Sequence, residues 1–273
     1  MSLVAHEQAA GAHYREAGAG KAIVCLHASA SSSAQWRPLM DRLGGRFRTL
    51  AADLYGSGRS PAWPGERPMW LADEVAWLAP VFKAAGARFH LVGHSYGGAV
   101  ALRAALAEPA RIESLVLFEP VLFSLLTAED PKHAATLEIA AVRDDTIAAV
   151  RAGHLDASGA RFVDYWMGPG AWARMPQARR ETIADQMRQV EAEWHAAFME
   201  PTPLSAFAAL DVPVLFLTGA ESPLSSREIG RLLTKTLPRV TSVEVSGAGH
   251  MAPLTHPERV NALIERFLEI AST

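Results

Sequence analysis

Residues 89–107 read FHLVGHSYGGAVALRAALA, and this stretch decides the fold. Its first six residues form a short apolar run typical of a buried strand, and its alanine-rich second half predicts a helix over residues 98–107. Ser95 stands at the turn between them, with Gly93 and Gly97 on either side. A serine at such a turn has a strained backbone that exposes its hydroxyl at the carboxyl edge of the sheet. Ser95 is therefore a candidate nucleophile.

Similar apolar runs recur along the chain and alternate with helical patterns. We expect strands over residues 22–27, 47–53, 89–94, 114–119, 212–219 and 241–247, and further helices over 69–84, 226–237 and 257–270. Strands that are apolar throughout indicate a sheet buried on both faces, and their alternation with helices predicts parallel strands. The sequence therefore predicts a doubly wound, mostly parallel α/β fold.

The strand pattern stops between residues 121 and 210. Helical patterns cover residues 131–151, 160–165 and 177–199, and they are separated by MGPG at 167–170 and EPTPLS at 200–205. Trp166, Trp172 and Trp194 lie here, which is more aromatic surface than an exposed helical segment needs. We expect residues 121–210 to form a helical cap, inserted after the strand that ends at Glu119. Residues 1–120 and 211–273 would then form the core domain.

A second candidate for chemistry is His250, in the sequence GAGHMAP at residues 247–253. Histidine is the side chain best suited to accept a serine proton near neutral pH. The loop follows the last predicted strand, so it reaches the same sheet edge as Ser95. We expect His250, rather than any of the other nine histidines, to act as the base.

Composition excludes several classes of protein. With 49% hydrophobic and 20% charged residues, the chain is neither disordered nor a coiled coil, and a net charge of −3 argues against nucleic acid or a membrane surface as partner. Cys25 is the only cysteine, so neither a disulfide nor a cysteine-based zinc site can form within the chain. No nucleotide, metal or cofactor motif is present. Residues 1–18 lack the pattern of a secretory signal, and we expect a cytoplasmic protein that acts on a small molecule without a cofactor. The oligomeric state is open.

With these residues, the chain resembles the capped, single-domain members of the α/β-hydrolase family over nearly its whole length. Two further motifs carry the resemblance, LHASAS at residues 26–31 and DLYGSGRS at residues 53–60. The resemblance implies an oxyanion hole formed by the backbone N–H groups of Ser29 and Tyr96. The chain departs from the family pattern at Ala28, where members usually have a glycine.

The acid that would orient His250 is missing from its usual place. Family members commonly have an aspartate after the penultimate strand, where this chain has Ser222. A serine hydroxyl cannot stabilise an imidazolium by charge, and loss of the carboxylate from such a triad costs about 10⁴ in turnover. A carboxylate from elsewhere is therefore expected.

Two glutamates compete for this role. Glu221 precedes Ser222, but side chains one residue apart near a strand end point in opposite directions. Glu119 ends the strand that we expect beside the nucleophile strand, and a carboxylate in such an apolar run is costly unless it has a partner. Some family branches, including certain haloalkane dehalogenases, take their acid from this place. We therefore predict Glu119 as the acid, with Glu221 as the alternative.

Together these residues predict a serine hydrolase with a triad of Ser95, His250 and Glu119. Its substrate would be an ester, or a related acyl compound, of small and largely apolar character. Two alternatives stay open. A cofactor-free lyase or carbon–carbon bond hydrolase could use the same fold, and polar or charged residues reaching into the pocket from the cap would favour it. A non-catalytic small-molecule-binding protein is the other alternative.

Overall fold

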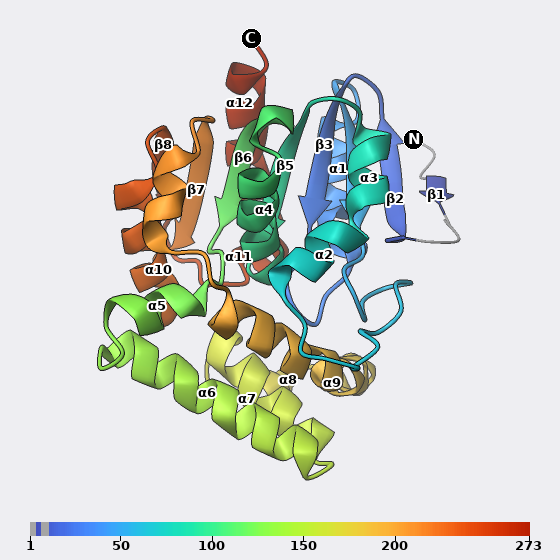
Figure 1. The fold of residues 1–273 in the computed structure, drawn as a ribbon. Coiled ribbons are helices and arrows are strands. Elements are labelled where there is room, and N and C mark those ends of the chain that lie inside the picture. Colours follow the sequence, from blue (N-terminus) through green and yellow to red (C-terminus); the bar gives the residue numbers. More distant parts are fainter. Residues whose placement is uncertain (1–3, 7–10) are drawn as a thin grey trace.

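The computed structural model describes residues 4–6 and 11–273 as a layered α/β structure (Figure 1). Its strands form one eight-stranded sheet in the order β1-β2-β4-β3-β5-β6-β7-β8. The bounds are β1 (Val4–His6), β2 (Tyr14–Gly18), β3 (Lys21–Leu26), β4 (Phe47–Ala52), β5 (Phe89–His94), β6 (Ile112–Phe118), β7 (Val214–Gly219) and β8 (Val240–Val245). The six strands β3 to β8 run parallel to one another. Strands β1 and β2 add an antiparallel pair at one edge of the sheet. The predicted doubly wound, mostly parallel fold is confirmed.

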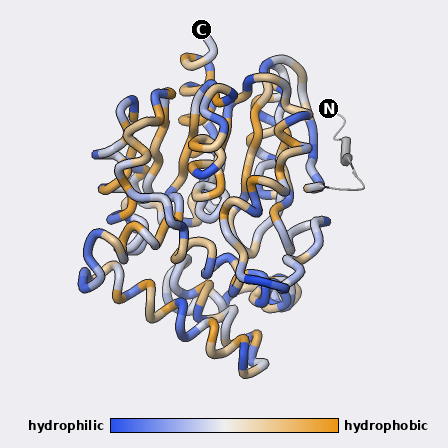
Figure 2. Tube along the Cα trace, viewed as in Figure 1, coloured by the Kyte–Doolittle hydropathy of each residue, from blue (hydrophilic) through white to orange (hydrophobic). Residues whose placement is uncertain are grey.

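Helices cover both faces of this sheet. On one face lie α2 (Leu71–Trp77), α3 (Ala79–Ala85), α4 (Tyr96–Ala107) and α10 (Leu224–Thr236); on the other lie α1 (Arg37–Leu43) and α12 (Pro257–Ala271). Each face of the sheet has its own hydrophobic core, and successive side chains of β3 alternate between them. Val24 and Leu26 lie in the core under α2, α3, α4 and α10. Ile23 and Cys25 lie in the core under α1 and α12. Figure 2 shows the strands as the most hydrophobic part of the chain. Burial on both faces explains why the strands read as continuous apolar runs.

Several elements differ from the sequence-based expectation. The helix expected over residues 69–84 is two helices that meet at Leu78, because Pro80 cannot donate a hydrogen bond inside a helix. Helix α1 and the antiparallel strand β2 were not predicted. The sequence of β2, YREAG, has only its first and fourth residues buried, so it lacks the apolar run that marked the other strands.

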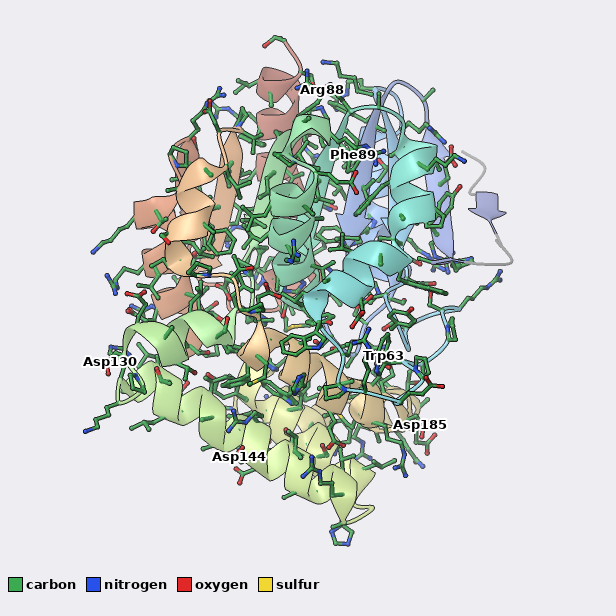
Figure 3. All side chains as sticks on the ribbon, in the orientation of Figure 1. Trp63, Arg88, Phe89, Asp130, Asp144 and Asp185 are labelled. Carbon is green, nitrogen blue, oxygen red and sulfur yellow. The ribbon has the colours of Figure 1, made fainter. Side chains whose placement is uncertain are left out.

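Residues 121–210, here called the helical insertion, connect β6 to β7. They form α5 (Phe123–Glu129), α6 (Ala134–Arg151), α7 (Leu155–Met167), α8 (Ala171–Arg174) and α9 (Gln177–Met199). These helices lie together at one end of the sheet (Figure 1). Their outer surface is polar, and Figure 3 shows the exposed side chains of Asp130, Asp144 and Asp185 at its rim. Trp166, Trp172 and Trp194 are buried beneath it.

The prediction that residues 1–18 hold no secretory signal falls partly on residues 1–3 and 7–10, which lie outside the described part of the chain. Within the described residues, none of the helices combines the length and the hydrophobicity needed to cross a lipid bilayer.

Candidate active site

Ser95 lies at the turn between β5 and α4. Its backbone has φ 56° and ψ −119°, a conformation that residues other than glycine rarely adopt. The turn is also tightly packed, because a Cβ atom at Gly97 would lie 2.4 Å from the carbonyl oxygens of Leu26 and His27. Glycine at this position therefore lets α4 approach the end of β3, and the strained turn presents the serine hydroxyl at the carboxyl edge of the sheet.

His250 reaches this edge from the loop that follows β8. Its Nε2 atom lies 2.9 Å from Oγ of Ser95, although the two residues are 155 positions apart. Both residues are buried, with exposed fractions of 1% for His250 and 5% for Ser95. The ring of Trp166 from α7 lies over the imidazole, with 4.1 Å between the ring centroids. The imidazole is therefore held between the serine and the helical insertion and shielded from water.

Glu119 lies behind the imidazole. Its Oε2 atom is 2.6 Å from Nδ1 of His250, and its Oε1 atom accepts a hydrogen bond of 2.6 Å from the backbone N–H of Gly219. The carboxyl is completely buried, and the residue has a positive φ of 44°. The second bond fixes the carboxyl plane, so that one oxygen is directed at the ring. Ser226 Oγ lies farther from the same nitrogen, at 3.3 Å.

Within the described residues, neither Glu221, the alternative acid, nor Ser222, at the usual position of the acid, forms a side-chain hydrogen bond with the ring. Glu221 is exposed, and its backbone N–H donates to the carbonyl of Ala248. Ser222 is buried, but within the described residues its hydroxyl has no hydrogen-bond partner. The structure thus brings Ser95, His250 and Glu119 together, and in its described residues no hydrogen bond joins the side chain of Glu221 or Ser222 to His250.

Ser29 and Tyr96 line the same small cavity as Ser95. Tyr96 is the first residue of α4, where backbone N–H groups have no partner within the helix. Ala28, the departure from the family pattern, has an ordinary backbone, and the positive φ of this loop falls at Ala30. The loop therefore accommodates an alanine at position 28 without strain.

A chain of hydrogen bonds that sequence reasoning missed connects this loop to His250. The amide of Gln35 accepts from the N–H of Ala28 and donates to Nδ1 of His94, 3.2 and 3.1 Å away. Nε2–H of His94 then donates to the carbonyl oxygen of His250 at 2.9 Å. Burial lowers the pKa of His94 well below its ordinary value, so the ring is neutral and can accept at one nitrogen and donate at the other. Two separate loops of the site are thereby held in register.

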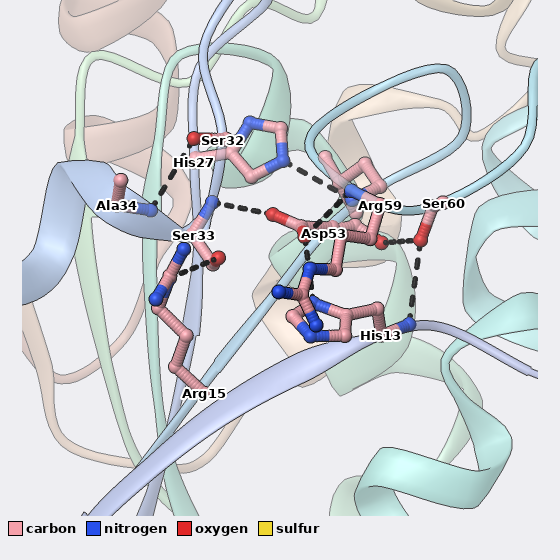
Figure 4. A network of polar contacts seen from close by, with 10 residues as sticks. His13, Arg15, His27, Ser32, Ser33, Ala34, Asp53, Arg59 and Ser60 are labelled. Carbon is pink, nitrogen blue, oxygen red and sulfur yellow. Dashed lines mark hydrogen bonds and ion pairs between the residues drawn. The ribbon is translucent and has the colours of Figure 1, made fainter. Parts of the chain in front are cut away.

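Asp53 anchors the loop that contains the DLYGSGRS motif (Figure 4). Its carboxylate lies 2.8 Å from Nδ1 of His13 and accepts backbone N–H bonds from Ser33 and Arg59. Ser33 begins the short 3₁₀ helix that carries Gln35. Asp53 therefore supports the site from behind and does not contact Ser95 or His250.

Comparison with known proteins identifies the family. The model of the alpha/beta hydrolase fold family matches residues 21–257. The chain belongs to the α/β-hydrolase family. This α/β hydrolase is 29% identical to a pimeloyl-[acyl-carrier protein] methyl ester esterase of Aeromonas hydrophila, over 92% of the chain and 96% of the relative. It is 25% identical to an (E)-2-((N-methylformamido)methylene)succinate hydrolase of Acinetobacter baylyi, over 94% of both.

Among solved structures, the fold is similar to that of a hydrolase from Pseudomonas aeruginosa, with a TM-score of 0.77 and 23% identity over 97% of this chain and 98% of the other. The predicted family, fold and enzyme class are confirmed. The site residues and the substrate of this α/β hydrolase stay predictions.

Proposed function

We propose that this α/β hydrolase cleaves an ester, or a related acyl bond, of a small and largely apolar substrate. The observation that carries the proposal is the continuous contact from Ser95 Oγ to His250 Nε2, at 2.9 Å, and from His250 Nδ1 to Glu119 Oε2, at 2.6 Å. A nucleophile, a base and an orienting acid in this order are the parts that acyl transfer through serine requires.

In the proposed reaction, Ser95 Oγ attacks the substrate carbonyl carbon while His250 Nε2 takes its proton. The negative charge of Glu119 stabilises the resulting imidazolium, and the N–H groups of Ser29 and Tyr96 donate to the oxyanion. His250 then gives its proton to the leaving alcohol, and an acyl ester remains on Ser95. Water attacks this ester with His250 again as base, which releases the acid and restores the hydroxyl of Ser95.

The helical insertion is proposed to act as the cap. Apart from Ser29, Ser95, Tyr96 and Glu193, the walls of the cavity at Ser95 are apolar and come mainly from the insertion: Val121, Phe123, Phe162, Trp166, Val190, Trp194 and Ala197. A second pocket shares Ser29, Phe162 and Trp166 with this cavity and also includes the exposed side chains of Met167 and Leu254. We propose this second pocket as the route between the cavity and solvent.

The proposal is tested with p-nitrophenyl esters and a fluorophosphonate probe. Wild-type protein should hydrolyse short-chain esters and be labelled at Ser95, and Ser95→Ala should lose both activities while keeping its melting temperature. Absence of labelling at saturating probe would contradict the proposal and favour the binding-protein alternative.

One observation favours a second candidate, a cofactor-free lyase or carbon–carbon bond hydrolase. Glu193 brings a carboxyl group from the helical insertion to the cavity at Ser95. Product analysis separates the two reactions, because ester hydrolysis releases an alcohol and an acid, whereas cleavage of a carbon–carbon bond in a diketone releases an acid and a ketone.

A further inference from the structure

Glu193 of α9 is a buried carboxyl that the proposed reaction does not use. The residue is 3% exposed and lines the same small cavity as Ser95. Its Oε2 atom is fully buried and has no hydrogen-bond partner among the described residues. An unpaired buried polar group costs free energy, so its presence in the wall of a ligand cavity points to a partner supplied by the ligand.

The groups around Glu193 favour its neutral, protonated form. Glu74 of α2, another completely buried carboxyl, lies close enough for their charges to interact, and the hydroxyl of Tyr96 of α4 approaches Glu74. The Ser29 hydroxyl contacts Glu193 and offsets the effect of burial only in part. Neither carboxyl forms an ion pair with a basic side chain in the described ranges. Burial raises the pKa of both Glu193 and Glu74 to about 8.

The remaining helices packed on α9 bring no counter-charge to Glu193. On the sides of α5 and α7 the cavity wall consists of Phe123, Phe162 and Trp166. On α6, the guanidinium of Arg143 lies over the ring of Phe198 at 4.3 Å, and the guanidinium of Arg151 pairs with Glu191. A carboxyl among aromatic rings and next to a second carboxyl keeps its proton at neutral pH, because ionisation without a cation is costly.

We propose that Glu193 determines specificity by donating a hydrogen bond from its protonated carboxyl to an acceptor oxygen in the acyl part of the substrate. The inference rests on the proposed function and extends it, because it names the substrate class: acyl chains that carry an ether or carbonyl oxygen beyond the scissile bond. The acyl part is assigned to this cavity because it stays attached to Ser95, while the leaving alcohol departs through the pocket that reaches the surface.

The substrates for the test differ by one atom. In p-nitrophenyl hexanoate the methylene group at C3, C4 or C5 is replaced by oxygen, giving the propoxyacetate, 3-ethoxypropanoate and 4-methoxybutanoate esters. For each protein we take the ratio of kcat/KM for the ether ester to kcat/KM for hexanoate. For at least one position of the oxygen, this ratio should be about tenfold higher in wild type than in Glu193→Leu. The comparison between proteins cancels the intrinsic reactivity of each ester.

Glu193→Gln is the matched variant, because its amide is a neutral donor of similar size. This variant should keep most of the wild-type preference for the ether ester over hexanoate. At pH 9 the variant should still show this preference, whereas wild type should lose it because Glu193 releases its proton. The inference is overturned if no ether separates wild type from Glu193→Leu, or if Glu193→Gln behaves like Glu193→Leu. It is also overturned if the carboxylate instead selects a chain ending in trimethylammonium.

Failure of the proposed function gives a different result, since no ester would then be hydrolysed by any of the three proteins. In that case calorimetric binding of the uncleaved ether and hexanoate esters to wild type and to Glu193→Leu decides the role of Glu193. Equal affinities would overturn it, and a loss of ether affinity confined to Glu193→Leu would support it.

Discussion

The carboxyl of Glu119 and the imidazole of His250 are 2.6 Å apart across 131 residues of chain, and the other oxygen of that carboxyl is held by Gly219. The carboxyl that meets the imidazole thus comes from the residue directly after β6, whereas Ser222, in the loop after β7, has no charge to contribute.

Glu119→Gln should lower kcat by about 10³ to 10⁴ with little change in KM. The introduced amide can still accept from Gly219 through its oxygen, which turns its NH₂ group toward Nδ1 of His250. That nitrogen would then accept, the ring proton would sit on Nε2, and His250 could no longer take the proton of Ser95. Steady-state kinetics with a p-nitrophenyl ester measure the effect. The matched control Glu221→Gln should behave as wild type, and the opposite pair of results would reassign the acid to Glu221.

Ser222→Asp should partly rescue Glu119→Gln. Ser222 Oγ lies beside Gly219, whose N–H holds Glu119, and it lacks a hydrogen-bond partner in the part of the chain that the structure describes. The double variant is expected to recover at least tenfold of the lost kcat. Ser222→Asp alone should be less stable and less active than wild type, because two buried carboxylates would then repel each other. A double variant no more active than Glu119→Gln would contradict this prediction.

Gln35→Met should lower the free energy of unfolding by about 2 to 4 kcal/mol, because it leaves the N–H of Ala28 and Nδ1 of His94 buried and unpaired. We also expect kcat to fall while KM changes little, since the loops of the site lose their register. Urea denaturation and kinetics measure the two effects. Gln177→Met, at an exposed position on α9, is the control and should change neither.

Gly97→Ala should destabilise the protein by about 3 kcal/mol, at the upper end of the cost of overpacking, because the added methyl group would collide with two backbone oxygens at the end of β3. Gly45→Ala is the control, since a Cβ atom there meets nothing within 4 Å. Thermal unfolding of the two variants should differ clearly, and equal melting temperatures would show that α4 can move away from β3 at little cost.

The stability of wild type should fall between pH 6 and pH 9, and Glu74→Gln should reduce this fall. The pKa of Glu74 is raised by burial and then by the charge of Glu193 to about 8. Between the ordinary glutamate value and 8, the folded state therefore binds more protons than the unfolded state, and stability decreases as pH rises. Urea denaturation at pH 6, 7.5 and 9 measures the slope. The exposed Glu66→Gln should leave the slope unchanged, and an equal slope in Glu74→Gln would contradict the raised pKa.

Sequence patterns predicted the strands well, because β3, β5, β6 and β7 are buried on both faces and are therefore mostly apolar. The strand at residues 89–94 and the helix at residues 177–199 are found with the predicted bounds. The antiparallel strand β2 was missed because only two of its five residues are buried. Pro80 was the available signal for the division between α2 and α3.

The candidate site was predicted to different depths. Ser95, His250 and Glu119 stood out because each breaks an apolar or glycine-rich pattern at a strand end. Gln35 carries no such signal, since its role depends on the side chain that the fold places opposite it. Glu193 had a detectable signal, because it follows Val190 by three residues on the apolar stripe of α9, where a carboxyl is out of place.

Glu119 is separated from the helical insertion by a single proline, Pro120, and the N–H of Val121 is bonded to the carbonyl of Ser95. Chimeras that graft a foreign lid onto this scaffold should therefore keep the native chain through Val121. A junction one or two residues earlier would replace Pro120 or Val121 together with the helical insertion. It would then change the backbone that positions the carboxyl of Glu119. The far junction, near residue 210, has a different restriction, because Phe207 and Leu210 are buried in the core there, so the two ends of the insertion differ as engineering sites.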